Sequence, residues 1–261
     1  MTPLHNLSLQ RLKSDIHAAL KHWHTVDDHQ SEHLLSSLFM VQNKRRTLGP
    51  QTSSALRLAA NNVLLQGLEQ LEKQQPQAAA ILKKRFLDQK TILNVSQQLG
   101  LTVDQVKHRQ RDALLQLANM LYALEIEARE AFITAQESQL EAKSYTRLFG
   151  IDDLSERLLT LLTAATPPWV ITLVGIGGIG KTSLANHTVR RAIRHLKYEE
   201  VIWLKIANQE KKNRSPFVTP KHTFQQIINQ LSKRLLPALP GDMILEERTQ
   251  QLQQLLKNQS Y

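Results

Sequence analysis

The sequence predicts a mostly α-helical N-terminal part, followed by an incomplete α/β domain in which a parallel sheet forms the middle of three layers. Three observations lead to this expectation. Apolar residues recur at helical spacing through most of residues 1–147. Short helical patterns joined by a glycine turn lie within residues 78–122. An apolar, β-branched run at 169–174 precedes a glycine-rich loop and another helical pattern, as a buried strand and its following helix would.

Length and composition limit the class of protein. The 261 residues allow two small domains, and an apolar content of 41% is enough for packed cores. The absence of cysteine excludes disulfides and cysteine-bound zinc, so we expect a cytoplasmic protein. Met1 is not followed by a basic flank and an apolar run, and no apolar run is long enough to span a bilayer. We therefore expect neither a signal peptide nor a membrane partner.

The net charge of +10 is spread along the chain. Residues 1–150 carry a net charge of +4, and residues 151–261 carry +6. Because the excess is not concentrated on one segment, the global charge is weak support for DNA binding.

Residues 1–77 form a predicted N-terminal helical region. We expect one or two helices up to residue 40, then a loop at 41–54, and then a helix that starts at the Thr52–Ser54 cap and ends before Pro76. The first helix is predicted from the spacing of Leu9, Leu12, Ile16, Leu20 and Trp23.

This region is rich in histidine, and His29 and His33 are four residues apart, a spacing that metal sites use. No pattern supplies a third ligand. We interpret the histidines as a solvated polar face and expect no metal ion other than Mg²⁺.

Residues 78–122 have the layout of a helix-turn-helix. A short helix at 79–88 is followed by Thr91, which can cap a helix at 92–99. Gly100 can end that helix in the left-handed conformation, and Thr102 can cap a third helix. The second helix of such a unit can lie in the major groove of DNA.

The run from Lys84 to Leu114 resembles the promoter-reading C-terminal domain of bacterial sigma factors. That family shows an arginine-aromatic start, an A-x-x-L-G-[LIV]-[ST] turn, then V-[KR]-x-R and an Ala-Leu pair; here Ser96 replaces the alanine of the turn. Residues 83–111 hold seven Lys/Arg against Asp88 and Asp104. The resemblance implies duplex DNA as a partner, and transcription regulation. The alternative is a three-helix bundle that contacts protein. The implied DNA contacts are Thr102, Asp104, Gln105, Lys107, His108, Arg109 and Arg111.

Residues 123–147 are predicted to be a connecting helix and linker. The helical period continues past Arg111 towards Ala135 without glycine or proline, and the linker is expected near 142–146. The acidic residues of this segment give it the opposite charge to the helix-turn-helix: Glu125, Glu127, Glu130, Glu137 and Glu141.

The glycine-rich stretch after residue 174 fits the phosphate-loop pattern G-x-x-x-x-G-K-[ST]. Such glycines let the backbone curl around phosphates, and the following helix presents its positive end to them. Lys181 would reach the β- and γ-phosphates, Thr182 would bind Mg²⁺, and Ser183 would help to hold the α-phosphate. The candidate phosphate-binding residues are Gly175, Gly177, Gly178, Ile179, Gly180, Lys181, Thr182 and Ser183.

Residues 148–261 resemble the NB-ARC domain, the nucleotide switch of STAND ATPases. The resemblance rests on Leu148–Leu154, a short helix, the glycine-rich loop and a second apolar run, Val201–Ala207. It implies ATP or ADP with Mg²⁺ as ligands, Phe149 and Gly150 beside the adenine, and Trp203 at the second strand. Ile151 stands where that family usually has arginine. The implied function is a bacterial signalling regulator that exchanges ADP for ATP and then releases an effector or forms a homo-oligomer.

Other phosphate-loop families fit less well. ParA-type ATPases need lysine at position 176, which is isoleucine here, and the Asn-Lys-x-Asp motif of GTPases is absent. We interpret Met243–Glu247 as the start of a helix at 246–256, and the resemblance places the acidic magnesium-binding strand beyond Tyr261. We therefore expect a piece of a longer regulator that does not hydrolyse ATP efficiently alone. A protein-binding scaffold and a plain phosphate-loop hydrolase or kinase remain as alternatives.

Overall fold

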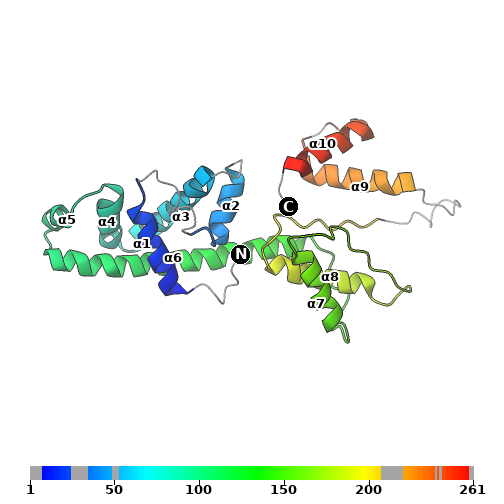
Figure 1. Ribbon diagram of the computed structural model, residues 1–261, viewed down its shortest axis with the longest axis horizontal. Coiled ribbons are helices and arrows are strands. Elements are labelled where there is room, and N and C mark those ends of the chain that lie inside the picture. The colour runs from blue at the N-terminus through cyan, green and yellow to red at the C-terminus, as the bar shows by residue number, and fades with distance from the viewer. Residues whose placement is uncertain are drawn as a thin grey trace. The chain divides into compact units, whose positions relative to one another are not determined.

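The computed structural model describes residues 8–24, 35–48, 53–206, 220–238, 240 and 243–258. Its contacts divide the chain into two units. The first unit comprises Met1–Glu137 with Leu148–Lys197, and the second comprises Ser138–Arg147 with Tyr198–Tyr261. The helices (Figure 1) are α1 (Leu9–Lys21), α2 (Phe39–Thr47), α3 (Ser53–Gln74), α4 (Pro76–Leu82), the π-helical turn η2 (Lys83–Leu87), α5 (Ile92–Leu99), α6 (Val103–Ser138), α7 (Asp152–Thr163), α8 (Lys181–Arg194), α9 (Pro220–Leu235) and α10 (Leu245–Asn258).

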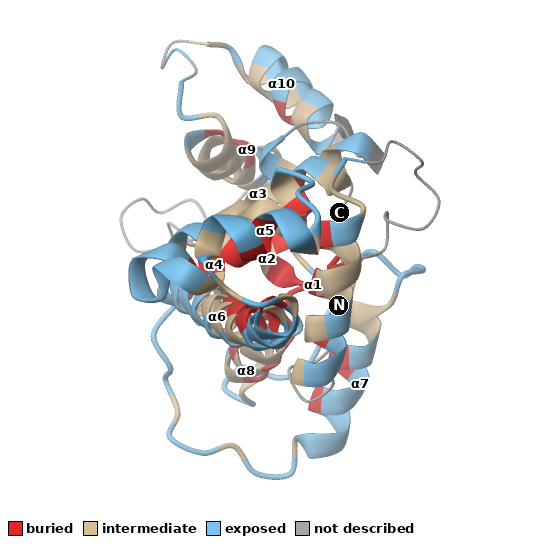
Figure 2. Ribbon diagram, turned by 90° about the vertical axis from the view of Figure 1, so that its left-hand side faces the viewer, coloured by how far each residue is buried: buried red, intermediate tan, exposed pale blue. Residues whose placement is uncertain are grey.

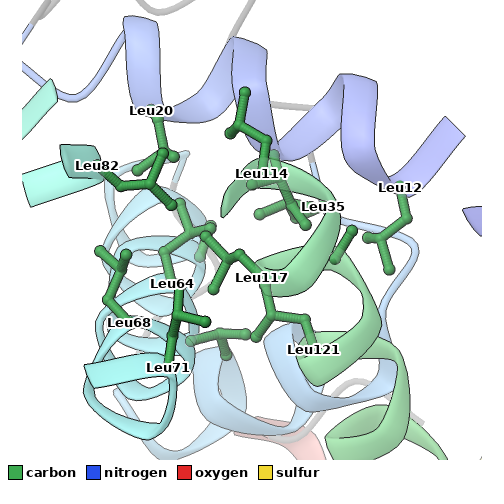
Figure 3. Packing of buried hydrophobic residues seen from close by; sticks show 14 of the residues in the cluster. Leu12, Leu20, Leu35, Leu64, Leu68, Leu71, Leu82, Leu114, Leu117 and Leu121 are labelled. Atoms are coloured by element: carbon green, nitrogen blue, oxygen red, sulfur yellow. The ribbon is translucent and has the colours of Figure 1, made fainter. Parts of the chain in front are cut away.

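Helix α6 is the longest element, and the N-terminal helices pack along it. Its 36 residues correspond to a length of about 54 Å. The main core joins α6 to α3, α1 and α4, and its leucines point towards one another (Figure 3). Helices α3 and α6 approach so closely at Gly67 that a Cβ atom there would stand 2.7 Å from Leu121 Cδ2. The fully buried leucines shown there include Leu20, Leu35, Leu64, Leu68, Leu71, Leu82, Leu117 and Leu121.

The prediction of a loop at 41–54 is wrong, because α2 occupies most of its first half. The residue before this helix, Leu38, has no side chain that could cap it. The missing acceptor comes from α6. Glu125, which is completely buried, accepts hydrogen bonds from the backbone N–H groups of Phe39 (2.7 Å) and Met40 (3.0 Å). Arg129 in turn donates to the same carboxylate at 2.6 Å. A helix whose cap lies 86 residues away in the sequence leaves no local signal.

Within residues 78–122 the predicted caps and the helix at 92–99 are confirmed, whereas the helix predicted at 79–88 begins already at Pro76 and is π-helical over Lys83–Leu87. Thr91 accepts from Asn94 N at 3.2 Å, and Gly100 ends α5 in the left-handed conformation with φ 63°. Thr102 and Gln105 form a reciprocal capping box at the start of α6. A small second core of Ile81, Val95 and Val106 holds α4, α5 and α6 together. In Figure 2 the buried residues of α5 and α6 lie on the sides that face the bundle.

The predicted parallel sheet is wrong, because no β-strand is present among the described residues. The segment 169–174, predicted to be a buried strand, has no regular secondary structure, and Trp169, Val170 and Val174 are exposed at 73%, 80% and 90%. The second predicted strand begins at Val201. Its described residues, which end at Ile206 before the gap at 207–219, also form no strand pairing. A strand is stabilised only by backbone partners, and a parallel pair also needs both faces covered. Two isolated apolar runs do not meet these conditions.

Helices α9 and α10 pack together in the second unit. Arg248 on α10 donates to Asn229 on α9 at 2.9 Å, and Arg234 on α9 pairs with Glu200 at 2.7 Å. Glu246 and Glu247 lie in the first turn of α10, which confirms their interpretation as the start of a helix. Within the described ranges, no helix has the length and apolar character needed to cross a membrane.

Candidate functional site: a glycine-rich loop at the start of α8

The glycine-rich loop depends on backbone conformations that only glycine adopts easily. Gly178 has φ 79° and Gly180 has φ 96°. A Cβ atom at Gly177, Gly178 or Gly180 would have no heavy atom within 4 Å. Gly178 and Gly180 are therefore required by their backbone conformation and not by crowding, whereas Gly177 has neither a positive φ nor a close neighbour.

The loop leads directly into α8, which begins at Lys181, so the helical pattern predicted after the loop is confirmed. Gly180 is the N-cap and contributes no side-chain acceptor to the first turn, and the first helical bond runs from Leu184 N to Gly180 O at 2.9 Å. The positive end of the helix dipole therefore faces the loop without a capping carboxylate or hydroxyl on the N-cap residue. The side chain of Thr182 is exposed at this end.

The side chain of Lys181 folds back over the loop. Its ammonium group donates to the backbone oxygens of Gly175 (2.9 Å) and Ile176 (2.8 Å). The charge thus lies on the inner side of the curled backbone, close to where the phosphates of a nucleotide would be expected. The glycine conformations, the uncapped helix start and the lysine together fit a phosphate group.

Two sets of ion pairs hold α8 on its neighbours. Arg191 binds Glu156 of α7 at 2.5 Å and donates to Ser155 Oγ at 3.0 Å. Glu137, near the end of α6, pairs with Arg190 at 3.3 Å and with Arg194 at 2.9 Å.

The sequence does not predict these contacts: its only signals are arginines three and four residues apart and the place of Glu137 in the acidic segment. The helix that begins at the loop is therefore clamped to α7 and to α6.

The residues that the NB-ARC resemblance places beside adenine lie immediately before α7. Gly150 has φ 66°, and the Phe149 side chain is 75% exposed. Most of the ring is therefore not covered by protein.

All seven DNA-contact candidates are exposed at the start of α6. Several of them already have partners within the protein. Thr102 and Gln105 cap α6, Lys107 pairs with Asp104 at 3.3 Å, and His108 Nδ1 lies 2.9 Å from Asp112. These contacts use side chains that a base-reading helix would direct towards DNA.

The remaining two candidates are the arginines. Arg109 donates to Gln77 at 3.1 Å, and Arg111 donates to the backbone oxygen of Lys107 at 3.4 Å. The guanidinium groups of both residues are on the exposed surface of the helix and keep further donors.

Within the part of the chain that the structure describes, no group of three or more His, Asp or Glu residues is placed to hold a metal ion. His29 and His33 lie outside the described residues.

Residues 151–261 match the family model of the NB-ARC domain. No curated protein and no solved structure gives a significant match to the chain. The match supports a nucleotide-binding P-loop NTPase domain of the NB-ARC type in this part of the chain, a class that binds ATP or ADP, typically with Mg²⁺, and acts in signalling.

Proposed function

We propose that this protein is a signalling regulator that is switched by ATP and ADP at the glycine-rich loop. The observation that carries this proposal is the position of Lys181, whose ammonium group is held over the loop by the carbonyls of Gly175 and Ile176. The match of residues 151–261 to the NB-ARC domain supports the same site independently of that geometry.

Each residue of the loop has a distinct role in this proposal. The backbone N–H groups from Gly175 to Gly180, including that of Ile179, would face the phosphates, and Lys181 would move from the two carbonyls to the β- and γ-phosphates. Ser183 would contact the α-phosphate, and the exposed hydroxyl of Thr182 would bind Mg²⁺, which offsets the charge of the phosphates. Phe149 and Gly150 would contact the adenine.

The ion pairs of α8 give the switch a route to the N-terminal helices. Because Glu137 binds two arginines of α8, a shift of α8 on nucleotide exchange would act on the end of α6. The four proposed regions are 1–77, 78–122, 123–147 and 148–261, and α6 is continuous across the boundary between the second and third. The part of the third region that lies in α6, up to Glu137, would therefore move together with the second region. We place the regulator in the cytoplasm, with an effector protein or a second copy as its partner.

Calorimetric titration with Mg-ATP and with ADP tests this proposal. We expect both nucleotides to bind, and Lys181→Ala to abolish or strongly weaken binding. Lys73→Ala, which removes an exposed lysine of α3, is the matched control and should bind as the unmodified protein does. If neither nucleotide binds to the folded protein, or if Lys181→Ala binds equally well, the proposal is wrong.

We propose duplex DNA as the partner of the helix-turn-helix. The exposure of the seven candidates and the further donors that Arg109 and Arg111 keep favour this partner. Phosphate contacts release counterions, so DNA affinity should fall steeply as the salt concentration rises, and Arg111→Gln should make that dependence shallower. Weak binding that does not respond to salt would instead favour the alternative function, a scaffold whose helical region binds protein.

A further inference from the structure

An open pocket of about 710 Å³ lies at the end of α8 opposite the glycine-rich loop. The 14 residues of α8 separate the two ends by about 21 Å. The pocket is formed by the turn before α2, by α2 itself, by the last residue of α7 and by the residues that follow α8. Its lining residues are Ser36, Ser37, Gln42, Arg46, Thr163, His195, Leu196 and Lys197.

The lining is polar and basic. Arg46 and Lys197 are cationic, His195 carries an imidazole, and three further residues carry hydroxyl groups. None of the described residues that line the pocket is acidic. A group of donors and cations without a carboxylate among them favours an anionic ligand.

Two strained backbone positions border the pocket. Leu35 has φ 62° and directly precedes Ser36, and Leu196 has φ 55° and directly precedes Lys197. Left-handed conformations are unfavourable for leucine, and such residues concentrate at ligand sites and switch regions. Both leucine side chains are buried, with exposures of 1% and 4%, so packing holds the two strained turns in place.

Hydrogen bonds fix the walls of the pocket before any ligand binds. The Gln42 side chain donates to the backbone oxygen of Ser36 at 2.5 Å, which joins α2 to the turn that precedes it. The Lys197 ammonium group donates to the backbone oxygens of Thr163 (2.9 Å) and Ala164, which joins the residues after α8 to the end of α7. Because these hydrogen bonds are already formed without a ligand, the lining residues need little reorganisation when a ligand binds.

We propose that this pocket binds a small anion that carries one or more phosphate groups. The forked guanidinium of Arg46 matches the geometry of phosphate oxygens, and hydroxyl and imidazole donors complete their hydrogen bonding. The volume of the pocket is within the range for small-molecule sites and exceeds the need of a single phosphate. A diphosphate or a compact phosphate ester is therefore the expected ligand class. When bound, it would link α2 to the ends of α7 and α8.

The experiment must separate this pocket from the glycine-rich loop, which also attracts phosphate. We would separate the two sites by calorimetric titration of the full chain and of Lys181→Ala. Each protein is titrated with pyrophosphate and with inorganic phosphate. We expect Lys181→Ala to retain one pyrophosphate site. In the Lys181→Ala background, Arg46→Gln should weaken that site about tenfold or more, since a charge-assisted hydrogen bond is lost. Arg157→Gln removes an exposed arginine of α7 that does not line the pocket, and it should leave the affinity unchanged.

Two results would overturn the proposal. The first is that folded Lys181→Ala binds no pyrophosphate, since all binding would then belong to the loop. The second is that Arg46→Gln and Arg157→Gln have the same affinity. If circular dichroism shows that Arg46→Gln does not fold, Lys197→Gln tests the opposite wall by the same comparison, and an unchanged affinity would again reject the site. Loss of nucleotide binding in Lys181→Ala does not affect the result, so the two proposals fail independently.

Discussion

The buried carboxylate of Glu125 should be the most sensitive single site of the N-terminal helical region. Its Oε1 accepts from Phe39 N at 2.7 Å and from Arg129 Nε at 2.6 Å, and its Oε2 accepts from Met40 N at 3.0 Å. Glu125 is 0% exposed and Arg129 is 3% exposed. Water therefore cannot replace the bonds when one partner is removed.

The substitution Glu125→Gln keeps the size of the side chain but removes its charge and one acceptor. If the amide oxygen takes the place of Oε1, the amide NH₂ group faces the N–H of Met40, so a buried donor is unsatisfied at a cost of about 1–3 kcal/mol. Arg129 also loses the carboxylate that compensates its charge. Removing one partner of a buried pair costs about 3–5 kcal/mol, and we expect a loss in this range.

Urea unfolding followed by circular dichroism measures the effect. The exchange rates of the Phe39 and Met40 amide hydrogens should rise in Glu125→Gln, because these groups begin α2. Glu130→Gln, on the exposed side of the same helix, should change the unfolding free energy by less than about 0.5 kcal/mol. Arg129→Met should also be destabilising, and the double variant should lose less than the sum of the single variants, by about 0.5–3 kcal/mol. If Glu125→Gln is as stable as Glu130→Gln, the cap is not what holds α2.

Two further predictions concern the same helical region. Gly100→Ala should cost about 1–2 kcal/mol in urea unfolding from backbone strain alone, because φ is 63° and no atom lies within 4 Å of the added Cβ. An unchanged urea midpoint for Gly100→Ala would show that residue 100 does not need the left-handed conformation. The pKa of His17 is lowered below 6.5 by burial and by the charges of Lys21 and Lys13, so the unfolded chain binds more protons near that pH. Stability should therefore fall as the pH drops through about 6.5, and His17→Gln should make the fall shallower. A steeper fall of stability in His17→Gln than in the unmodified protein would contradict the lowered pKa of His17.

Much of the helical structure could be predicted from short-range patterns. The caps at Thr91 and Thr102 and the left-handed turn at Gly100 are formed by atoms only a few residues apart. The glycine-rich loop and the start of α8 are local in the same way, since they depend on glycine conformations and on a lysine that folds back over six residues. In each of these elements the interacting residues lie within about six positions of one another in the sequence.

The clamp on α8 could not be predicted in this way. Glu137 is 53 residues from Arg190, and nothing in the local pattern joins them. The phosphate pocket at the far end of α8 is likewise assembled from three separate segments, and its strained leucines look like ordinary core residues in the sequence. Contacts of this kind exist only once the helices have packed.

The sequence by itself determined where most helices begin and end and which residues form the glycine-rich loop, because those features depend on neighbours in the chain. The tertiary structure decided the rest. It formed α2 with a carboxylate from α6, and it left the apolar run at 169–174 without a strand partner. A helix makes its hydrogen bonds within itself, so a local pattern predicts it. A strand, or a helix capped from a distance, needs backbone or side-chain partners that only the folded arrangement can supply.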